Sequence, residues 1–216
     1  MKRILLTLIA LGTMFAVGAQ TDYHIQKVTL FELLPVGHRD IVFLGNSLTD
    51  GCEWAELFGN PHIKNRGINA DNTVQMLERL DPIVSGQPKK LFLLTGVNDL
   101  ADGRSPEATA ENIARIVDRF RKESPRTKIF VQSVLPVNDT YGRFKSYKDG
   151  ALDEPIRKLN VLIEKLCAER GIVFIDLYSH FVGEDGRMKA ELTNDGLHLK
   201  GPGYLIWKGV IEKYVK

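Results

Sequence analysis

Short apolar runs alternate with amphipathic segments along most of this 216-residue chain. The segments between the later runs repeat their apolar residues every three or four positions, which is typical of a helix with one buried face. Strands that alternate with helices build a parallel sheet, and right-handed crossovers place the helices in two outer layers. The pattern therefore predicts an α/β fold, whose strands are expected at 41–44, 62–65, 90–95, 128–134 and 172–176.

Capping residues indicate where several helices begin and end. Ser105-Pro106-Glu107 has the order of an N-cap residue followed by proline at the first helical position. Gly171 is typical of a residue that ends a helix. Further helices are predicted after Asn72, from Asp153 to Gly171, and around Tyr204 to Ile211 near the end of the chain.

Two segments carry no clear periodic pattern. Residues 20–38 are expected to form an N-terminal segment that packs against the sheet. The longest irregular stretch runs from Pro136 to Ala151 and contains three aromatic residues. A loop of this length is either a lid or binding loop, or a surface excursion, and the sequence leaves both open.

The first 19 residues have the pattern of a secretory signal peptide. A basic start at Lys2 and Arg3 precedes an apolar stretch from Ile4 to Val17, and small residues up to Ala19 form a cleavage site. The apolar stretch has about 14 residues, fewer than the ~20 that a membrane-spanning helix needs. We therefore expect residues 20–216 to be one exported domain, periplasmic or extracellular, without a membrane span.

Composition excludes some classes of function. Removal of residues 1–19 takes away Lys2 and Arg3, so the 29 basic residues fall to 27, which equals the number of acidic residues. A protein that binds nucleic acid usually has a basic excess, so no nucleic-acid partner is expected. The two cysteines, Cys52 and Cys167, are predicted to be free thiols, because a chain of this length has core enough without a disulfide. No motif for a metal or cofactor is present, and nothing indicates the oligomeric state.

Polar segments follow the predicted strands at the points where the strands end. Ligands bind outside the carboxyl ends of the strands in an open parallel sheet, so these segments are expected to meet at one rim. They are Gly45-Asn46-Ser47, Asn65-Arg66-Gly67, Thr95 to Asp99, and Thr193 to His198 near the C-terminus.

The chemistry of these segments is complementary. Ser47 becomes a nucleophile only when a base takes its proton, and an imidazole such as that of His198 is the usual base near neutral pH. Asp195 can hold the tautomer of that imidazole. Attack on an ester creates an oxyanion, for which the Ser47 N–H, the Gly67 N–H and the Asn98 side chain are candidate donors. Each residue alone has an ordinary explanation as a turn, cap or surface residue, and only the ordered set indicates an esterase.

The same segments resemble the markers of the SGNH branch of the GDSL-type esterases and lipases. The matching sequences are GNSL at 45–48, the glycine of NRGI at 65–68, GVND at 96–99 and DGLH at 195–198. The resemblance implies a flavodoxin-like three-layer α/β/α fold with a mostly five-stranded parallel sheet. It also implies Ser47 as nucleophile, His198 as base, Asp195 as the residue that orients the base, and Ser47, Gly67 and Asn98 as the oxyanion site.

One position departs from the family pattern. Asn46 stands where the family usually has Asp. Asparagine keeps the local hydrogen bonds that such a turn needs, so we interpret it as variation within an active enzyme.

The expected substrate is a short acyl ester, with acetyl esters of carbohydrates as the first choice. The chain has no basic cluster for phospholipid head groups and no long apolar loop, and the resemblance includes acetylhydrolases and carbohydrate acetylesterases. Short-chain lipase or lysophospholipase activity is the alternative. The candidate substrate-binding residues are Trp54, Val97, Tyr141 and Phe144.

Two rival interpretations fit the sequence less well. An α/β-hydrolase needs a second glycine in its nucleophile turn, where this chain has Thr49. A phosphate- or flavin-binding module would place Asp50 and Glu53 beside an anionic ligand and would leave His198 without a role. A carbohydrate-binding pseudoenzyme remains open on sequence grounds.

Overall fold

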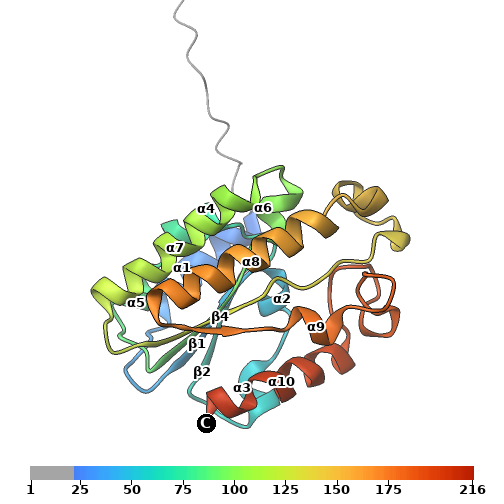
Figure 1. Ribbon diagram of the computed structural model, residues 1–216. Coiled ribbons are helices and arrows are strands. Elements are labelled where there is room, and N and C mark those ends of the chain that lie inside the picture. The colour runs from blue at the N-terminus through green and yellow to red at the C-terminus, as the bar shows by residue number, and fades with distance from the viewer. Residues whose placement is uncertain (1–21) are drawn as a thin grey trace, which may run out of the picture.

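The computed structural model describes residues 22–216, so the predicted signal peptide lies outside the described residues (Figure 1). The sheet has five parallel strands in the order β2-β1-β3-β4-β5, which confirms the predicted flavodoxin-like arrangement. The strands are β1 Ile41–Gly45, β2 Ile63–Gly67, β3 Lys90–Leu94, β4 Lys128–Gln132 and β5 Val173–Ile175. All five lie within or next to their predicted ranges.

Helices cover both faces of the sheet, and Figure 1 shows α7 and α8 side by side across one face with α10 on the other. The helices on the α7 side are α4 Thr73–Glu78, α5 Asp81–Val84, α6 Val97–Ala101, α7 Pro106–Glu123 and α8 Asp153–Arg170. The α10 side carries α2 Ser47–Asp50, α3 Trp54–Phe58, α9 Tyr178–Phe181 and α10 Gly201–Val215. Residues 20–38, predicted only as a packed segment, form α1 Asp22–Leu33 in their described part.

The predicted caps are present at the ends of the longer helices. Ser105 accepts a hydrogen bond from the Ala108 N–H at the start of α7, and Gly171 ends α8 in a left-handed conformation with φ of 63°. Asn72 caps α4 and exchanges reciprocal hydrogen bonds with Gln75 in a capping box.

The core is divided by the sheet into two apolar layers. Alternate residues of each strand point to opposite faces, so Val42 and Leu44 pack under α7 and α8 while Ile41 and Phe43 face α3 and α10. On the α10 side the ring of Phe43 stacks on Trp54 at 4.5 Å and on Phe92 at 4.9 Å between centroids. Full burial of each such side chain stabilises the fold by roughly 1.5–3 kcal/mol.

The register of the strands places their carboxyl ends at one level. Gly45 at the end of β1 pairs with Gly67 of β2 and with Leu94 of β3. The polar segments that follow these three residues therefore begin side by side, as the sequence predicts.

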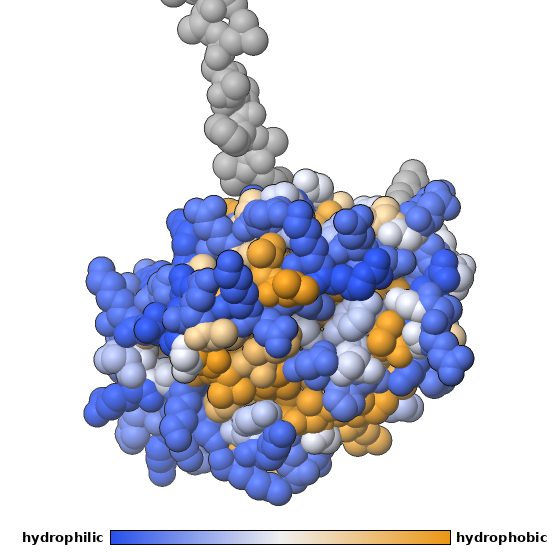
Figure 2. Space-filling model, in the orientation of Figure 1, coloured by the Kyte–Doolittle hydropathy of each residue, from blue (hydrophilic) through white to orange (hydrophobic). Residues whose placement is uncertain are grey.

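Figure 2 shows apolar surface gathered between α8 and α10, where the short strand β5 forms the edge of the sheet and Val173 is partly exposed.

Cys52 and Cys167 are both free and buried, as predicted. No helix within residues 22–216 has both the length and the apolar character needed to cross a membrane.

Candidate active site

Ser47 begins a single helical turn directly after β1. The side chain of Asn46 caps this turn by accepting a hydrogen bond from the Leu48 N–H at 3.1 Å, which is the contact expected when Asn replaces the family's Asp. The side-chain amide of Asn65 donates to the backbone oxygens of Thr49, Asp50 and Cys52 at 3.0 to 3.2 Å. The turn that carries Ser47 is therefore fixed at both ends by neighbouring side chains.

His198 and Asp195 lie on a loop between η3 Ala190–Leu192 and α10. The loop is closed by an antiparallel bridge between Thr193 and Leu199, and the Thr193 hydroxyl accepts a hydrogen bond from the Gly196 N–H. One carboxylate oxygen of Asp195 accepts from the backbone N–H groups of Leu197 and His198, at 2.9 and 2.8 Å. The backbone of the loop itself therefore holds the carboxylate beside the imidazole.

The three side chains form one continuous line. The second carboxylate oxygen of Asp195 is 2.7 Å from His198 Nδ1, and His198 Nε2 is 2.9 Å from Ser47 Oγ. Burial raises the pKa of Asp195, but the hydrogen bonds from the His198 ring and from the backbone outweigh it, so the net pKa is lowered. An ionised carboxylate only accepts hydrogen bonds. His198 therefore carries its proton on Nδ1, and Nε2 is left to accept the proton of Ser47.

Asn98 lies in the first turn of α6, on the cavity side of Ser47. Its side-chain nitrogen donates to the backbone oxygen of Asp71 at 2.8 Å. This bond uses one of the two N–H groups of the amide, so the other can point at a ligand. The neighbouring Asp99 is fully buried and binds the Thr73 N–H and hydroxyl and the Arg104 guanidinium, which fixes α6 against α4.

The structure corrects the prediction for Gly67. Its N–H donates to the Asn65 side chain at 2.8 Å, and Gly67 is not among the residues that line the cavity beside Ser47. A Cβ atom at this position would come within 2.2 Å of the Asp50 nitrogen. Gly67 is therefore needed for the close approach of β2 to the nucleophile turn, and it is not a free donor.

The loop after Gly67 places another backbone N–H group at the cavity. Asn69 and Ala70 line the same cavity as Ser47 and Asn98. Ala70 has φ of 62°, in the left-handed region that favours glycine, and its N–H donates no hydrogen bond within the described part of the chain. Sequence reasoning missed Ala70 because nothing about an alanine signals a positive φ.

The cavity in front of Ser47 and His198 has a volume of about 220 Å³. Besides the residues already named, its walls are formed by Ala101, Phe144, Ser146, Tyr147 and Leu197. Of the predicted substrate-binding residues, only Phe144 lies there. Its ring meets the His198 ring edge-on at 6.1 Å between centroids.

The other three predicted substrate-binding residues lie elsewhere, and the structure corrects them. Trp54 and Val97 are each 1% exposed and belong to the two core layers. Tyr141 is outside the cavity lining, and its hydroxyl lies within hydrogen-bond distance of the backbone oxygens of Ala190 and Thr193. The loop of residues 136–151 therefore forms one wall of the cavity through Phe144, Ser146 and Tyr147. Tyr141 instead contacts the segment that leads to the His198 loop.

Within residues 22–216 no group of three His, Cys, Asp or Glu side chains is placed to hold a metal ion.

The line of Ser47, His198 and Asp195 can transfer a proton from Ser47 to His198, and hydrogen-bond donors lie close by for a negatively charged oxygen.

Comparison with known proteins places the chain in a family. A model of the GDSL-like lipase/acylhydrolase family matches residues 43–206. Platelet-activating factor acetylhydrolase IB subunit alpha1 of Bos taurus is 30% identical over 172 residues, which cover 76% of this chain and 70% of that relative. The residues that match the family model, 43–206, include most of the sheet and the site.

Solved structures agree with this match. One from Streptococcus pneumoniae has a TM-score of 0.80 and 28% identity, over 90% of this chain and 93% of that one. A GDSL-like lipase from Bacteroides thetaiotaomicron has a TM-score of 0.76 and 26% identity, over 89% and 96% of the two chains. The chain therefore belongs to the GDSL-like lipase/acylhydrolase family and is a carboxylic ester hydrolase.

Proposed function

We propose that the protein removes short acyl groups, acetyl above all, from ester substrates, with Ser47 as the nucleophile. The observation that carries this proposal is the line from Ser47 through His198 to Asp195, with contacts of 2.9 and 2.7 Å. His198 takes the proton of Ser47 during attack and returns it to the leaving alcohol. Water then repeats the sequence on the acyl-enzyme and releases the acid.

The oxyanion of the tetrahedral intermediate lies between three donors in this mechanism. They are the N–H of Ser47, the N–H of Ala70 and the free N–H of the Asn98 amide. The Ser47 N–H is one of the donors that the first turn of a helix leaves without an internal partner. Such fixed donors are worth about 2.7–4 kcal/mol each in the transition state.

The size of the cavity supports a short acyl group. About 220 Å³ lies in front of Ser47, and Leu197, Phe144 and Tyr147 form apolar walls around it. Acetyl esters of carbohydrates in the periplasm or outside the cell remain the first proposal for the natural substrate. The name of the bovine relative favours a second candidate, an acetyl ester of a phospholipid.

The decisive experiment is a hydrolysis profile over p-nitrophenyl esters of two to twelve carbons, with Ser47→Ala as the control. The proposal expects kcat/KM to be highest for acetyl and to fall steeply beyond four carbons. Acetylated xylo-oligosaccharide and an acetylated ether phospholipid then separate the two candidate substrates. A maximum at eight carbons or longer would contradict the proposal, as would a Ser47→Ala variant that keeps its activity.

A further inference from the structure

The N-terminal helix α1 lies outside residues 43–206, which match the family model, yet it contacts the turn that carries Ser47. The Tyr23 hydroxyl and the Lys27 ammonium each donate to the Asp50 carboxylate at 2.7 Å. Asp50 is the last residue of the one-turn helix that Ser47 begins. A helix this short has few internal hydrogen bonds, so its orientation depends on contacts from outside.

The same helix also contacts the loop of residues 68–72, which carries Ala70. His24 Nδ1 is 3.2 Å from one carboxylate oxygen of Asp71, and Arg79 Nε donates to the other at 2.7 Å. The backbone oxygen of Asp71 is the group that accepts the Asn98 amide. Asp71 therefore connects α1 to both of the donors that lie across the cavity from the Ser47 turn.

Arg79 extends this connection to the ends of two strands. Its second terminal nitrogen donates to the backbone oxygens of Gly45 at 3.1 Å and of Arg66 at 3.0 Å. Gly45 precedes the nucleophile turn by a single residue. The buried cluster His24, Asp71 and Arg79 thus joins α1, β1, β2 and loop 68–72 beneath the site.

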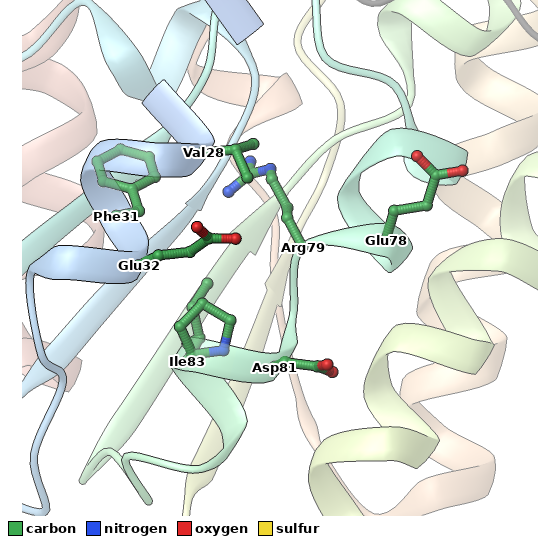
Figure 3. Close-up of a pocket in the computed structure, with 8 residues that line it drawn as sticks. Val28, Phe31, Glu32, Glu78, Arg79, Asp81 and Ile83 are labelled. Carbon is green, nitrogen blue, oxygen red and sulfur yellow. The ribbon is translucent and has the colours of Figure 1, made fainter. Parts of the chain in front are cut away.

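Packing of α1 keeps this cluster out of water. The Arg66 guanidinium lies 4.7 Å from the centre of the Phe31 ring and donates to the Leu34 oxygen at 3.0 Å. Figure 3 shows Val28 and Phe31 facing Arg79 and Ile83 around a cavity of about 90 Å³. His24, Asp71 and Arg79 are each 5% exposed or less. The pair of Asp71 and Arg79 interacts more strongly in such surroundings than at a surface, which makes the geometry of the cluster stiff.

We propose that α1 is a positioning element of the active site, in which Tyr23, His24 and Lys27 hold the nucleophile turn and loop 68–72 in the geometry that the reaction needs. The inference rests on the proposed function, because it assigns to Ala70, Asn98 and Ser47 the roles given above. Small displacements of reacting groups cost up to about 100-fold in rate. Loss of these contacts therefore lowers kcat more than it changes KM.

Two sets of variants test the proposal in the full chain. His24→Leu removes the contact to Asp71, and His24→Asn replaces the ring nitrogen by an amide nitrogen at a similar distance from the backbone. Tyr23→Phe combined with Lys27→Met removes both donors to Asp50 from partly exposed positions, where folding is expected to survive. Gln26→Ala, on the exposed side of α1, is the matched control.

The readouts are kcat and KM for p-nitrophenyl acetate, with active sites counted by complete labelling with a fluorophosphonate. We expect kcat to fall by about 10- to 100-fold in His24→Leu and in the double variant, with KM within about threefold. His24→Asn is expected to regain most of the loss, and Gln26→Ala to match the wild type. If His24→Leu does not fold, the double variant decides alone.

Unchanged kcat per labelled site in the α1 variants would overturn the proposal. The proposal would also be overturned if His24→Asn did not restore the kcat lost in His24→Leu and the double variant kept the kcat of the wild type. Ser47→Ala separates this failure from that of the proposed function. If Ser47→Ala still hydrolyses the ester, the proposed function is contradicted. If Ser47→Ala is inactive and the α1 variants are fully active, only the role of α1 is contradicted.

Discussion

Two histidine–aspartate pairs lie near the carboxyl ends of the strands, and their surroundings differ. His198 and Asp195 open onto a cavity, with Ser47 on the far ring nitrogen. His24 and Asp71 lie beneath α1, with Arg79 on the other carboxylate oxygen. Burial raises the pKa of Asp71 although Arg79 opposes it, whereas hydrogen bonds lower the pKa of Asp195 in spite of burial.

The comparison shows that a histidine beside a carboxylate is not by itself a catalytic unit. The pair of Asp195 and His198 borders the cavity, and the imidazole contacts the hydroxyl of Ser47. The pair beneath α1 does neither, and its contacts hold the chain around it in place. The same two residue types thus support chemistry in one place and position in the other.

Asp195→Asn is the change with the largest expected effect on turnover. An amide can donate to the imidazole and so favours the wrong tautomer, which leaves Nε2 unable to accept the proton of Ser47. We expect kcat to fall by about 10⁴-fold with little change in melting temperature. Steady-state kinetics and thermal unfolding on one preparation check this, and a variant that keeps a tenth of its activity would remove Asp195 from the mechanism.

Asn98→Ala is expected to have the next largest effect on turnover. The variant loses a donor that meets negative charge only as it develops, so kcat should fall by on the order of 10²–10³ while KM changes little. The measurement is kcat and KM beside the melting temperature. A destabilised enzyme with normal kcat would mean that Asn98 only holds loop 68–72 through the Asp71 oxygen.

Asp71→Asn acts on the second pair, and its main effect is on stability. Arg79 then remains buried without its carboxylate partner, and breaking a buried pair costs about 3–5 kcal/mol of unfolding free energy. Urea unfolding of the variant and of Asp195→Asn compares the two pairs directly. Equal losses of stability in both variants would contradict the division of roles.

The smallest expected effect concerns the pH dependence of stability. Asp195 has a lowered pKa in the folded protein, so its contribution is present above the ordinary carboxyl pKa of about 3.9 and is lost as pH falls through the folded value. Between about pH 5 and pH 3 the wild type should therefore lose slightly more stability than Asp195→Asn. Thermal unfolding across this range tests the prediction, and parallel curves for the two proteins would contradict a lowered pKa of Asp195.

The sheet could be predicted because its strands are buried on both faces. Ile41 to Leu44 and Leu91 to Leu94 are continuous apolar runs, and such runs leave few alternatives between flanking turns. β2 has a weaker apolar pattern than β1 and β3, because the polar residues Lys64, Asn65 and Arg66 follow Ile63. The burial of Arg66 depends on Phe31 and Leu34 of a distant segment, which no local pattern reveals.

The site was predictable where the residue type itself carries the chemistry. The hydroxyl of Ser47, the carboxylate of Asp195 and the imidazole of His198 have chemistry that can be recognised from the residue type. The structure brings the three side chains together. Trp54 was misplaced because nearness to Ser47 in sequence does not fix direction, and α3 turns the ring onto Phe43 in the core. Gly67 was predicted as a donor and Ala70 was missed, because the direction of a backbone N–H group depends on φ angles and hydrogen bonds that exist only in the folded loop.

His198 activates Ser47 in the proposed mechanism, and the rate of covalent labelling at Ser47 measures that activation. The wild type and His198→Ala are treated with a fluorophosphonate, the labelled peptide is located by mass spectrometry, and the rate of labelling is measured. We expect one modified residue, Ser47, and a labelling rate that falls by several orders of magnitude in His198→Ala. Modification of a different serine, or an equal rate of labelling at Ser47 without His198, would contradict this mechanism.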